Sequence, residues 1–392
     1  MHHSYTNRLV GLFIAFALIS GSAFGATRHK AKGHAARRTT TRKTVLAAHH
    51  PVSHLSRLHK RRIPSGNWDS PTFADSTEGD LVDGEDLVVR RAAVQALGPY
   101  NGSVVVVDPG TGRLLTIVNQ KLALKSGFQP CSTIKIVAAL AGLNEGLIDQ
   151  STLMRISRRR SIDLTEALAH SNNQFFSSVG YKLGYNKIVH YAQLFGLGEK
   201  AGLNIEGEQP GTLAAAPPSA GVGMMTSFGE GIYMTPLELA GMMTVVANGG
   251  TLYYLQHPRS KEDIDQFVPR VKRQLDVQPW LPQIKPGMSG AVEYGTARRA
   301  SYASSDPIFG KTGTCTDSRS PTHLGWFGSY NELGNNKLVV VVLLTGGGRV
   351  NGPVASGIAG AVYKNLSEEN YSTQSRPASP IALNSTQSCC RQ

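Results

Sequence analysis

Acidic residues are missing from the first part of this chain. Residues 1–62 contain 12 of the 40 lysines and arginines and none of the 27 aspartates and glutamates. The formal net charge of +13 therefore arises almost wholly from this segment, and the rest of the 392 residues is nearly neutral. The basic character belongs to an N-terminal arm and does not describe the main domain.

Other features are scarce as well. No internal repeat is visible, and the chain has only four cysteines, of which Cys389 and Cys390 lie in a polar tail and have no assigned role. After the apolar residues 9–26, no second stretch is long and apolar enough to cross a bilayer. This absence argues against a sensor that signals through a second membrane segment.

The N-terminus has the features of a secretion signal. Arg8 precedes an apolar run over residues 9–19, and Ala23 and Gly25 supply small side chains at the two positions that a signal peptidase reads. We expect residues 1–25 to be a cleaved signal peptide, and the protein to be exported to the periplasm or the cell envelope. A retained membrane anchor is the alternative, because residues 9–26 reach the lower limit of about 18 residues for a bilayer span.

The basic arm follows this signal. Residues 26–65 are rich in Ala, Thr, His, Lys and Arg without periodicity, which predicts a disordered linker. Because export removes nucleic acid as a partner, we expect an anionic wall polymer or a membrane surface as its ligand. A tether that only aids solubility is the alternative. The main domain is expected over residues 66–368, and residues 369–392 are expected to be a polar, disordered tail.

Ser132 and Lys135 are the first candidate catalytic pair. Ser132 opens an apolar run, residues 134–143, that ends near Gly146 and predicts a buried helix. The three-residue offset would place both side chains on one helix face, where a neutral lysine amine could take the serine proton during attack on a carbonyl. That role needs a lysine pKa well below about 10.4. Burial beside a second cation would lower the pKa in this way.

Two further motifs follow in order. They are Ser171-Asn172-Asn173 and Lys311-Thr312-Gly313-Thr314, with Gly325-Trp326-Phe327-Gly328 shortly afterwards. Residues 308–314 predict a strand, and an edge strand beside a nucleophile can pair with an extended peptide and offer an N–H to an oxyanion. Taken singly, the motifs are also compatible with a helix cap, a solvated lysine, a surface turn and a helix end. Their occurrence as an ordered set favours catalysis.

Together these motifs resemble those of the penicillin-binding protein and serine β-lactamase superfamily. Flanking residues extend the resemblance to penicillin-binding transpeptidase domains over about residues 84–366. The resemblance implies an exported penicillin-binding protein, a serine D,D-transpeptidase that acts on D-Ala-D-Ala peptidoglycan stem peptides through an acyl-enzyme. It also implies inhibition by β-lactams, and no metal or cofactor.

The resemblance also assigns roles to residues of this chain. Ser132 would be the nucleophile, Lys135 its base, and Ser171 the relay that protonates the leaving amine. Asn173 would bind the substrate amide, and the backbone N–H groups of Ser132 and Thr314 would form the oxyanion hole. The substrate carboxylate would be held by the third motif, Lys311, Thr312, Gly313 and Thr314, and Lys311 could be the cation beside Lys135.

The expected fold class is α+β, an antiparallel sheet flanked by helices with an inserted all-helical subdomain over about residues 149–248. Residues 103–118 predict a hairpin, residues 324–330 and 337–345 two more strands, and residues 353–366 a terminal helix. Thr235 and Glu238 predict a helix start with a capping box, and Gly249 predicts its end.

Cys131 precedes the nucleophile and Cys315 follows the third motif. Some class A β-lactamases with carbapenemase activity have cysteines at both places, joined as a disulfide, so this resemblance implies a Cys131–Cys315 bond in an oxidising compartment. Most penicillin-binding proteins have glycine before the nucleophile, and this chain departs from them there. Two buried free thiols are the alternative.

Other activities on the same fold stay open. A D,D-carboxypeptidase passes the acyl group to water, and a serine β-lactamase needs a device for rapid deacylation. Glu206 and Glu208 lie in the general interval where class A enzymes carry their deacylating Glu, but their context matches the penicillin-binding pattern better. Class D enzymes usually carry an apolar residue where this chain has Asn173. A non-enzymatic β-lactam sensor or wall-binding protein is a third class. The chain is expected to be too short for a fused glycosyltransferase.

Overall fold

The computed structural model describes residues 68–302, 306–332 and 337–371. The expected signal peptide and basic linker, and almost all of the expected tail, lie outside the described residues. None of the helices within these ranges is long and apolar enough to cross a membrane.

Helices and strands are interspersed along the described part of the chain. The helices are α1 (Leu87–Leu97), α2 (Gln120–Ala123), α3 (Lys135–Asn144), α4 (Leu164–Ala169), α5 (Asn173–Leu183), α6 (Tyr185–Leu194), α7 (Val222–Phe228), α8 (Pro236–Asn248), α9 (Lys261–Asp265), α10 (Leu281–Glu293) and α11 (Gly352–Glu368), with 3-10 turns η1 (Cys131–Ile134) and η2 (Arg298–Ala300). The strands are β1 (Gly102–Asp108), β2 (Arg113–Val118), β3 (Met154–Ser157), β4 (Arg160–Ile162), β5 (Thr212–Leu213), β6 (Ile232–Tyr233), β7 (Thr251–Tyr253), β8 (Val271–Gln274), β9 (Ile308–Thr316), β10 (His323–Asn331) and β11 (Val339–Gly346).

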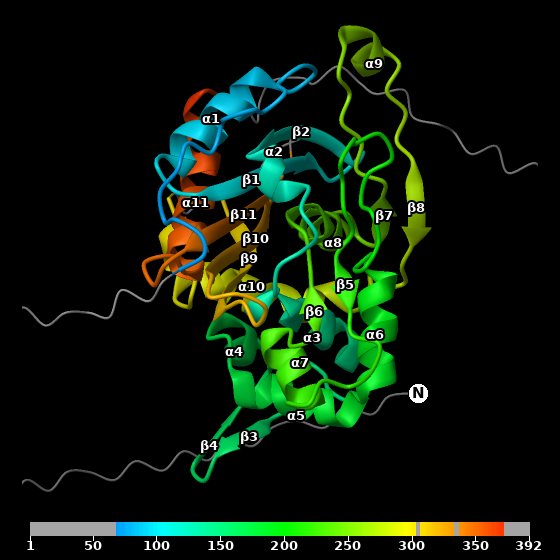
Figure 1. Cartoon of the computed structure of the whole chain (residues 1–392). Coiled ribbons are helices and arrows are strands. Elements are labelled where there is room, and N and C mark those ends of the chain that lie inside the picture. The colour runs from blue at the N-terminus through cyan, green and yellow to red at the C-terminus, as the bar shows by residue number, and fades with distance from the viewer. Residues whose placement is uncertain (1–67, 303–305, 333–336, 372–392) are drawn as a thin grey trace, which may run out of the picture. The chain divides into compact units, whose positions relative to one another are not determined.

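Five of the strands form one antiparallel sheet in the order β2-β1-β11-β10-β9 (Figure 1). The hairpin, the two later strands and the terminal helix expected from the sequence are all confirmed. β9, which carries the third motif, lies at the edge of the sheet. One side of this strand is therefore not paired within the sheet, as peptide binding by strand addition requires.

Both faces of the sheet are buried, which explains the unbroken valine runs in β1 and β11. Val104 and Val106 belong to a core that includes side chains of α1 and α11, whereas Val105 and Val107 belong to a core with α3 and α8. Successive strand residues point to opposite faces, so a strand covered on both sides is apolar at every position. α3, which starts directly after the nucleophile motif, is thus anchored in the second core.

The segment over residues 149–248 is mainly helical, with α4 to α8, but it is not all-helical as the sequence suggested. It also holds the short antiparallel pairs β3–β4 and β5–β6. Strands of two to four residues are too short to show an alternating apolar pattern, and β3–β4 is rich in arginine. The expectation of an all-helical insert is therefore corrected.

α8 begins with the capping box that the sequence predicted, formed by Thr235 and Glu238, and Gly249 at its C-terminus has φ 90°. The Glu238 carboxylate also accepts hydrogen bonds from the N–H groups of Gly198 and Gly211, at 2.7 and 3.0 Å. Burial raises the pKa of Glu238 to about 7. One side chain thus caps a core helix and fastens the loop that precedes it.

Candidate active site

The candidate nucleophile lies in a tight turn. Ser132 belongs to the 3-10 turn η1, and the α-helix α3 starts only at Lys135. The sequence predicted a shared helix face, and the structure brings the pair together through this turn: Lys135 Nζ lies 2.8 Å from Ser132 Oγ. The Ser132 residue is 8% exposed and Lys135 is fully buried. A hydroxyl and an amine are therefore in contact where little water reaches them.

Lys135 also touches the second motif. Its Nζ lies 2.9 Å from the Ser171 carbonyl oxygen, 3.1 Å from Ser171 Oγ and 2.6 Å from Asn173 Oδ1. A neutral amine has two N–H donors and one lone pair. If the donors serve the Ser171 carbonyl and Asn173, the lone pair is left for the Ser132 hydroxyl. The geometry therefore suits an amine that accepts the serine proton.

Burial is the main cause that lowers the pKa of Lys135 well below its ordinary value, and the charge of Lys311 adds to it. Burial also lowers the pKa of Lys311 to about 7. Two buried ammonium groups in one site repel each other, so a proton on one of them disfavours a proton on the other. The site thus favours a neutral Lys135 while Lys311 is charged.

The second motif forms the turn between α4 and α5. Ser171 has φ 55°, in the left-handed region that non-glycine residues rarely adopt. Asn172 then caps α5, with its side chain accepting from the Phe175 N–H at 2.8 Å. This reversal of the chain directs both the carbonyl and the hydroxyl of Ser171 at Lys135. The strained backbone is held by contacts on each side of it.

The third motif approaches the nucleophile turn through Gly313. In the β9–β10 ladder Gly313 is opposite Trp326, and a Cβ at Gly313 would lie 2.9 Å from the Pro130 carbonyl oxygen and 3.2 Å from Trp326 Cβ. Any larger residue would push β9 away from the turn. Glycine here sets the spacing between the edge strand and Ser132.

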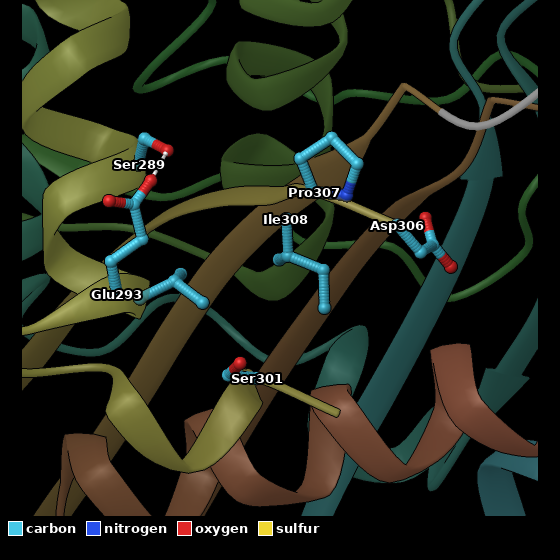
Figure 2. A pocket seen from close by; sticks show the side chains of 7 residues that line it. Ser289, Glu293, Ser301, Asp306, Pro307 and Ile308 are labelled. Carbon is cyan, nitrogen blue, oxygen red and sulfur yellow. Dashed lines mark hydrogen bonds between the residues drawn. The ribbon is translucent and has the colours of Figure 1, made fainter. Parts of the chain in front are cut away.

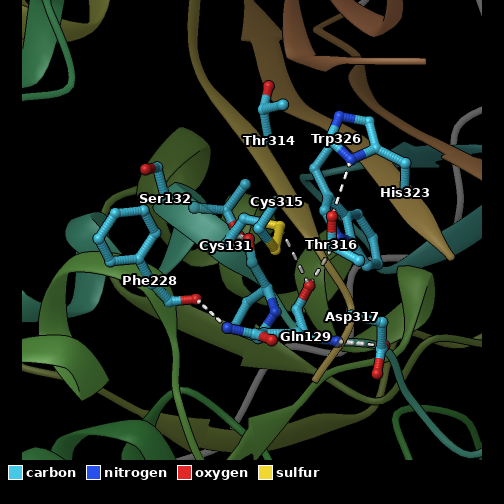
Figure 3. The surroundings of a disulfide bond; sticks show 12 residues. Gln129, Cys131, Ser132, Phe228, Thr314, Cys315, Thr316, Asp317, His323 and Trp326 are labelled. Carbon is cyan, nitrogen blue, oxygen red and sulfur yellow. Dashed lines mark hydrogen bonds between the residues drawn. A yellow bond between two sulfur atoms is a disulfide. The ribbon is translucent and has the colours of Figure 1, made fainter. Parts of the chain in front are cut away.

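A disulfide joins the nucleophile turn to the same strand (Figure 3). The sulfurs of Cys131 and Cys315 are bonded, with the Cα atoms 5.6 Å apart. Gln129 adds two hydrogen bonds: its N–H donates to Asp317 Oδ2 at 3.2 Å and its carbonyl accepts from Trp326 Nε1 at 2.9 Å. The turn that carries Ser132 is thus fixed to β9 and β10 by covalent and polar contacts.

Cys131 itself has φ 51°, a left-handed conformation that glycine adopts readily. The sequence showed cysteine where related proteins usually have glycine, and this backbone angle gives the physical reason for that preference. In this chain the disulfide holds a residue that the backbone alone would disfavour.

Thr296 is a site residue that the sequence analysis missed. Its Oγ1 lies 2.6 Å from Thr312 Oγ1, and its N–H donates to the Ala169 carbonyl at 3.1 Å. It therefore links the third-motif strand to the end of α4, just before Ser171. The sequence carries no signal for it; in the structure the preceding Gly295 fits tightly there, since a Cβ would lie 2.2 Å from the Ala169 carbonyl oxygen.

Thr314 lies at the exposed part of β9, and its Oγ1 accepts a hydrogen bond from the Gly352 N–H at 2.8 Å. The hydroxyl hydrogen of Thr314 stays available for a ligand. Lys311 Nζ donates to the Thr312 carbonyl at 3.1 Å. The side chains expected to hold a carboxylate are therefore each oriented by a neighbouring group.

Other acidic groups are engaged elsewhere. Glu208, expected as a deacylating residue only in the β-lactamase alternative, is buried and accepts hydrogen bonds from the N–H groups of Ala201 and Gly202. Glu206 is exposed and lies 4.0 Å from Arg259. Within residues 68–302, 306–332 and 337–371, no group of three or more His, Cys, Asp or Glu side chains is arranged to hold a metal ion.

A separate cavity of about 350 Å³ lies at the start of β9 (Figure 2). Ser289 and Glu293 of α10 line it together with Asp306 and Ile308. None of the motif residues contributes to this lining, so the cavity is distinct from the Ser132 site.

A family profile and the curated relatives of this chain point to the same protein family. The sequence profile of the penicillin-binding protein transpeptidase domain matches residues 102–368. Stage V sporulation protein D of Bacillus subtilis is 26% identical over 313 residues, which cover 69% of this chain and 48% of that protein. The probable peptidoglycan D,D-transpeptidase PbpC of Pseudomonas aeruginosa is 26% identical over 294 residues, 60% of this chain and 52% of that protein.

Among solved structures, the TP domain of penicillin-binding protein 3 from Burkholderia pseudomallei superposes with a TM-score of 0.62 at 19% identity, covering 74% of this chain and 96% of that domain. At this identity the likeness supports the fold. The chain spans about half the length of the first curated relatives it matches.

Proposed function

Since the chain belongs to the penicillin-binding protein transpeptidase domain family, we propose that it is an exported serine D,D-transpeptidase acting on the D-Ala-D-Ala ends of peptidoglycan stem peptides. One observation carries the proposal: the buried amine of Lys135 lies 2.8 Å from the Ser132 hydroxyl. A serine paired with a lysine of lowered pKa is an activated nucleophile for acyl transfer.

In the proposed reaction Ser132 attacks the carbonyl of the penultimate D-Ala, and Lys135 takes its proton. Ser171, 3.1 Å from Lys135 Nζ, passes a proton to the nitrogen of the departing D-Ala. The backbone N–H groups of Ser132 and Thr314 stabilise the oxyanion, an effect of about 3–4 kcal/mol for a donor of this kind. The acyl group is then transferred to a peptide amine, or to water in the carboxypeptidase alternative.

The terminal carboxylate of the substrate is held by Lys311, Thr312 and Thr314, and Asn173 bonds the substrate amide. A carboxylate beside Lys311 raises the pKa of this lysine from its value of about 7 and keeps it charged. That charge in turn favours the neutral form of Lys135. Binding of the anionic substrate thus supports the protonation states that attack requires, without a metal or cofactor.

The β-lactamase alternative is less well supported. A class A mechanism needs a carboxylate that activates water at the acyl-enzyme, and Glu208 instead satisfies the N–H groups of a loop. β-Lactams would therefore act as inhibitors that form a long-lived adduct on Ser132.

The test is covalent labelling of the purified protein with a fluorescent penicillin. We expect a stable adduct, lasting hours, that Ser132→Ala abolishes, whereas the control Ser289→Ala in the separate cavity leaves labelling unchanged. Labelling that survives Ser132→Ala would move the nucleophile elsewhere. An adduct that hydrolyses within a second would favour a β-lactamase.

A further inference from the structure

The hairpin formed by β3 and β4 carries a concentrated positive charge. Arg155, Arg158, Arg159 and Arg160 are all exposed, within six consecutive residues. Figure 1 shows this hairpin projecting beyond α5, away from the large sheet. The chain after residue 62 is nearly neutral overall, so this is a local feature of the domain.

The charge of the hairpin is largely uncompensated within the described ranges. Among the residues that the structure describes, one carboxylate, that of Glu166, comes within 4.0 Å of an arginine of the hairpin, Arg160. The guanidinium of Arg155 donates to the carbonyl groups of Ser157 and Arg158, at 3.1 and 2.8 Å. These bonds order the turn while leaving its positive charge exposed.

A line of side chains connects the hairpin to the second motif. Glu166 Oε2 lies 4.0 Å from Arg160 and 3.5 Å from His170 Nε2. His170 directly precedes Ser171, which contacts Lys135. Glu166 and His170 therefore connect the base of the hairpin to the turn that carries Ser171.

We propose that this arginine hairpin binds the polymeric form of the substrate, an uncrosslinked strand whose stem peptides each end in a carboxylate. This inference rests on the proposed function and adds the substrate form. While one stem occupies the site at Ser132, carboxylates of neighbouring stems pair with the arginines, whose planar guanidinium groups suit carboxylates.

Each exposed pair is weak alone, but several on one strand act together once the first stem is bound. A polymer is favoured over a membrane because the exposed side chains from Arg155 to Ser161 are arginines and serines, with no aromatic or leucine side chain that would enter a bilayer. The exposed Leu153 lies before β3, at the base of the hairpin and away from its turn.

The experiment measures protection from fluorescent-penicillin labelling by two competitors, a soluble uncrosslinked peptidoglycan strand and a single D-Ala-D-Ala peptide. It uses the full chain, the quadruple variant Arg155→Gln, Arg158→Gln, Arg159→Gln, Arg160→Gln, and a control of equal charge change with Lys261, Arg298, Arg299 and Lys364 replaced by Gln. For the quadruple variant, the strand concentration that halves the labelling rate should be at least about fivefold higher than for the wild type. This difference between the two proteins should shrink steeply as the salt concentration rises. Protection by the single peptide, and labelling itself, should stay unchanged.

Equal strand protection in wild type and quadruple variant, or an equal loss in the control, would overturn the proposal. Should the quadruple variant fold poorly, Arg158→Glu with Arg159→Glu at the tip leaves the ordering bonds of Arg155 in place and is expected to show the same shift. Loss of binding to anionic phospholipid vesicles without loss of strand protection would assign the hairpin to a lipid surface instead. If neither competitor protects the wild-type protein from labelling, the result would refute the proposed function as well as the role of the hairpin.

Discussion

At the residue scale, the site is organised around one buried amine. Lys135 contacts Ser132, Ser171 and Asn173, so three polar side chains of the first two motifs meet at its Nζ. The sequence predicted these residues through the family resemblance, which rests on their types and their order along the chain.

The first prediction concerns the protonation of Lys135. Because its pKa is lowered by burial and by Lys311, the neutral, reactive fraction grows as pH rises through this lowered pKa, and acylation by penicillin should rise with it. Lys135→Arg should be slower by about 100-fold or more, since a guanidinium stays protonated. Rapid-mixing measurements of acylation across pH provide the check, with Lys200→Arg, at an exposed lysine, as the control. An Arg variant that keeps most of the rate would exclude the base role.

Thr296 could not be predicted from the sequence, because a lone threonine outside the motifs carries no pattern. To donate to a substrate carboxylate, the Thr312 hydroxyl must accept from Thr296. Thr296 is therefore a positioning residue. Thr296→Val should weaken acylation by penicillins with a free carboxylate by about 3–10-fold, the effect of one hydrogen bond, and should change acylation by their esters little. Thr296→Ser should restore the difference. An equal effect on acid and ester would mean that Thr296 is merely structural.

At the element scale, the success of the sequence analysis depends on the length of each element and on its caps. α8 could be placed because Thr235, Glu238 and Gly249 mark both of its ends. β1 and β11 could be placed because burial on both faces leaves continuous apolar runs. The pairs β3–β4 and β5–β6 gave no such signal. The 3-10 turn at Ser132 was also missed, because the left-handed angle of Cys131 is set by tertiary contacts.

The disulfide between Cys131 and Cys315 links two of these elements, η1 and β9, across 184 residues. Removing it should lower the free energy of unfolding by about 2–5 kcal/mol, because the denatured chain gains freedom. It should also slow acylation, because without the covalent link residue 131 is no longer held in its left-handed conformation and Ser132 is less firmly positioned. The checks are the Tm and the acylation rate of Cys131→Ala with Cys315→Ala.

The remaining two cysteines supply the control for this experiment. The double variant Cys389→Ser with Cys390→Ser should keep the wild-type Tm and acylation rate. Because this variant still contains Cys131 and Cys315, adding a reducing agent to it should lower both its Tm and its acylation rate. A double variant at Cys131 and Cys315 that keeps the wild-type Tm would show that the bond does not stabilise the fold.

At the scale of the whole molecule, the candidate site combines segments that are far apart in the chain. Ser132 precedes α3, Ser171 lies in the mainly helical segment, and Lys311 lies on the edge of the sheet. The sequence could predict this meeting only through the family resemblance, because no local pattern specifies contacts over more than a hundred residues. The contacts themselves, such as Gly313 against Pro130, came from the structure.

The last prediction concerns the basic segment over residues 26–65, which lies outside the described residues. It holds 11 lysines and arginines and no carboxylate, so it should bind isolated cell wall or anionic vesicles, and this binding should weaken as salt screens the charges. Replacing the 11 residues by glutamine keeps the length and removes the charge. This variant should lose the salt-dependent binding in sedimentation assays, yet acylate with penicillin at the wild-type rate, because all groups of the site lie after residue 130. Binding that persists in the glutamine variant at low salt would assign the attraction to the main domain, where the arginine hairpin is the next candidate.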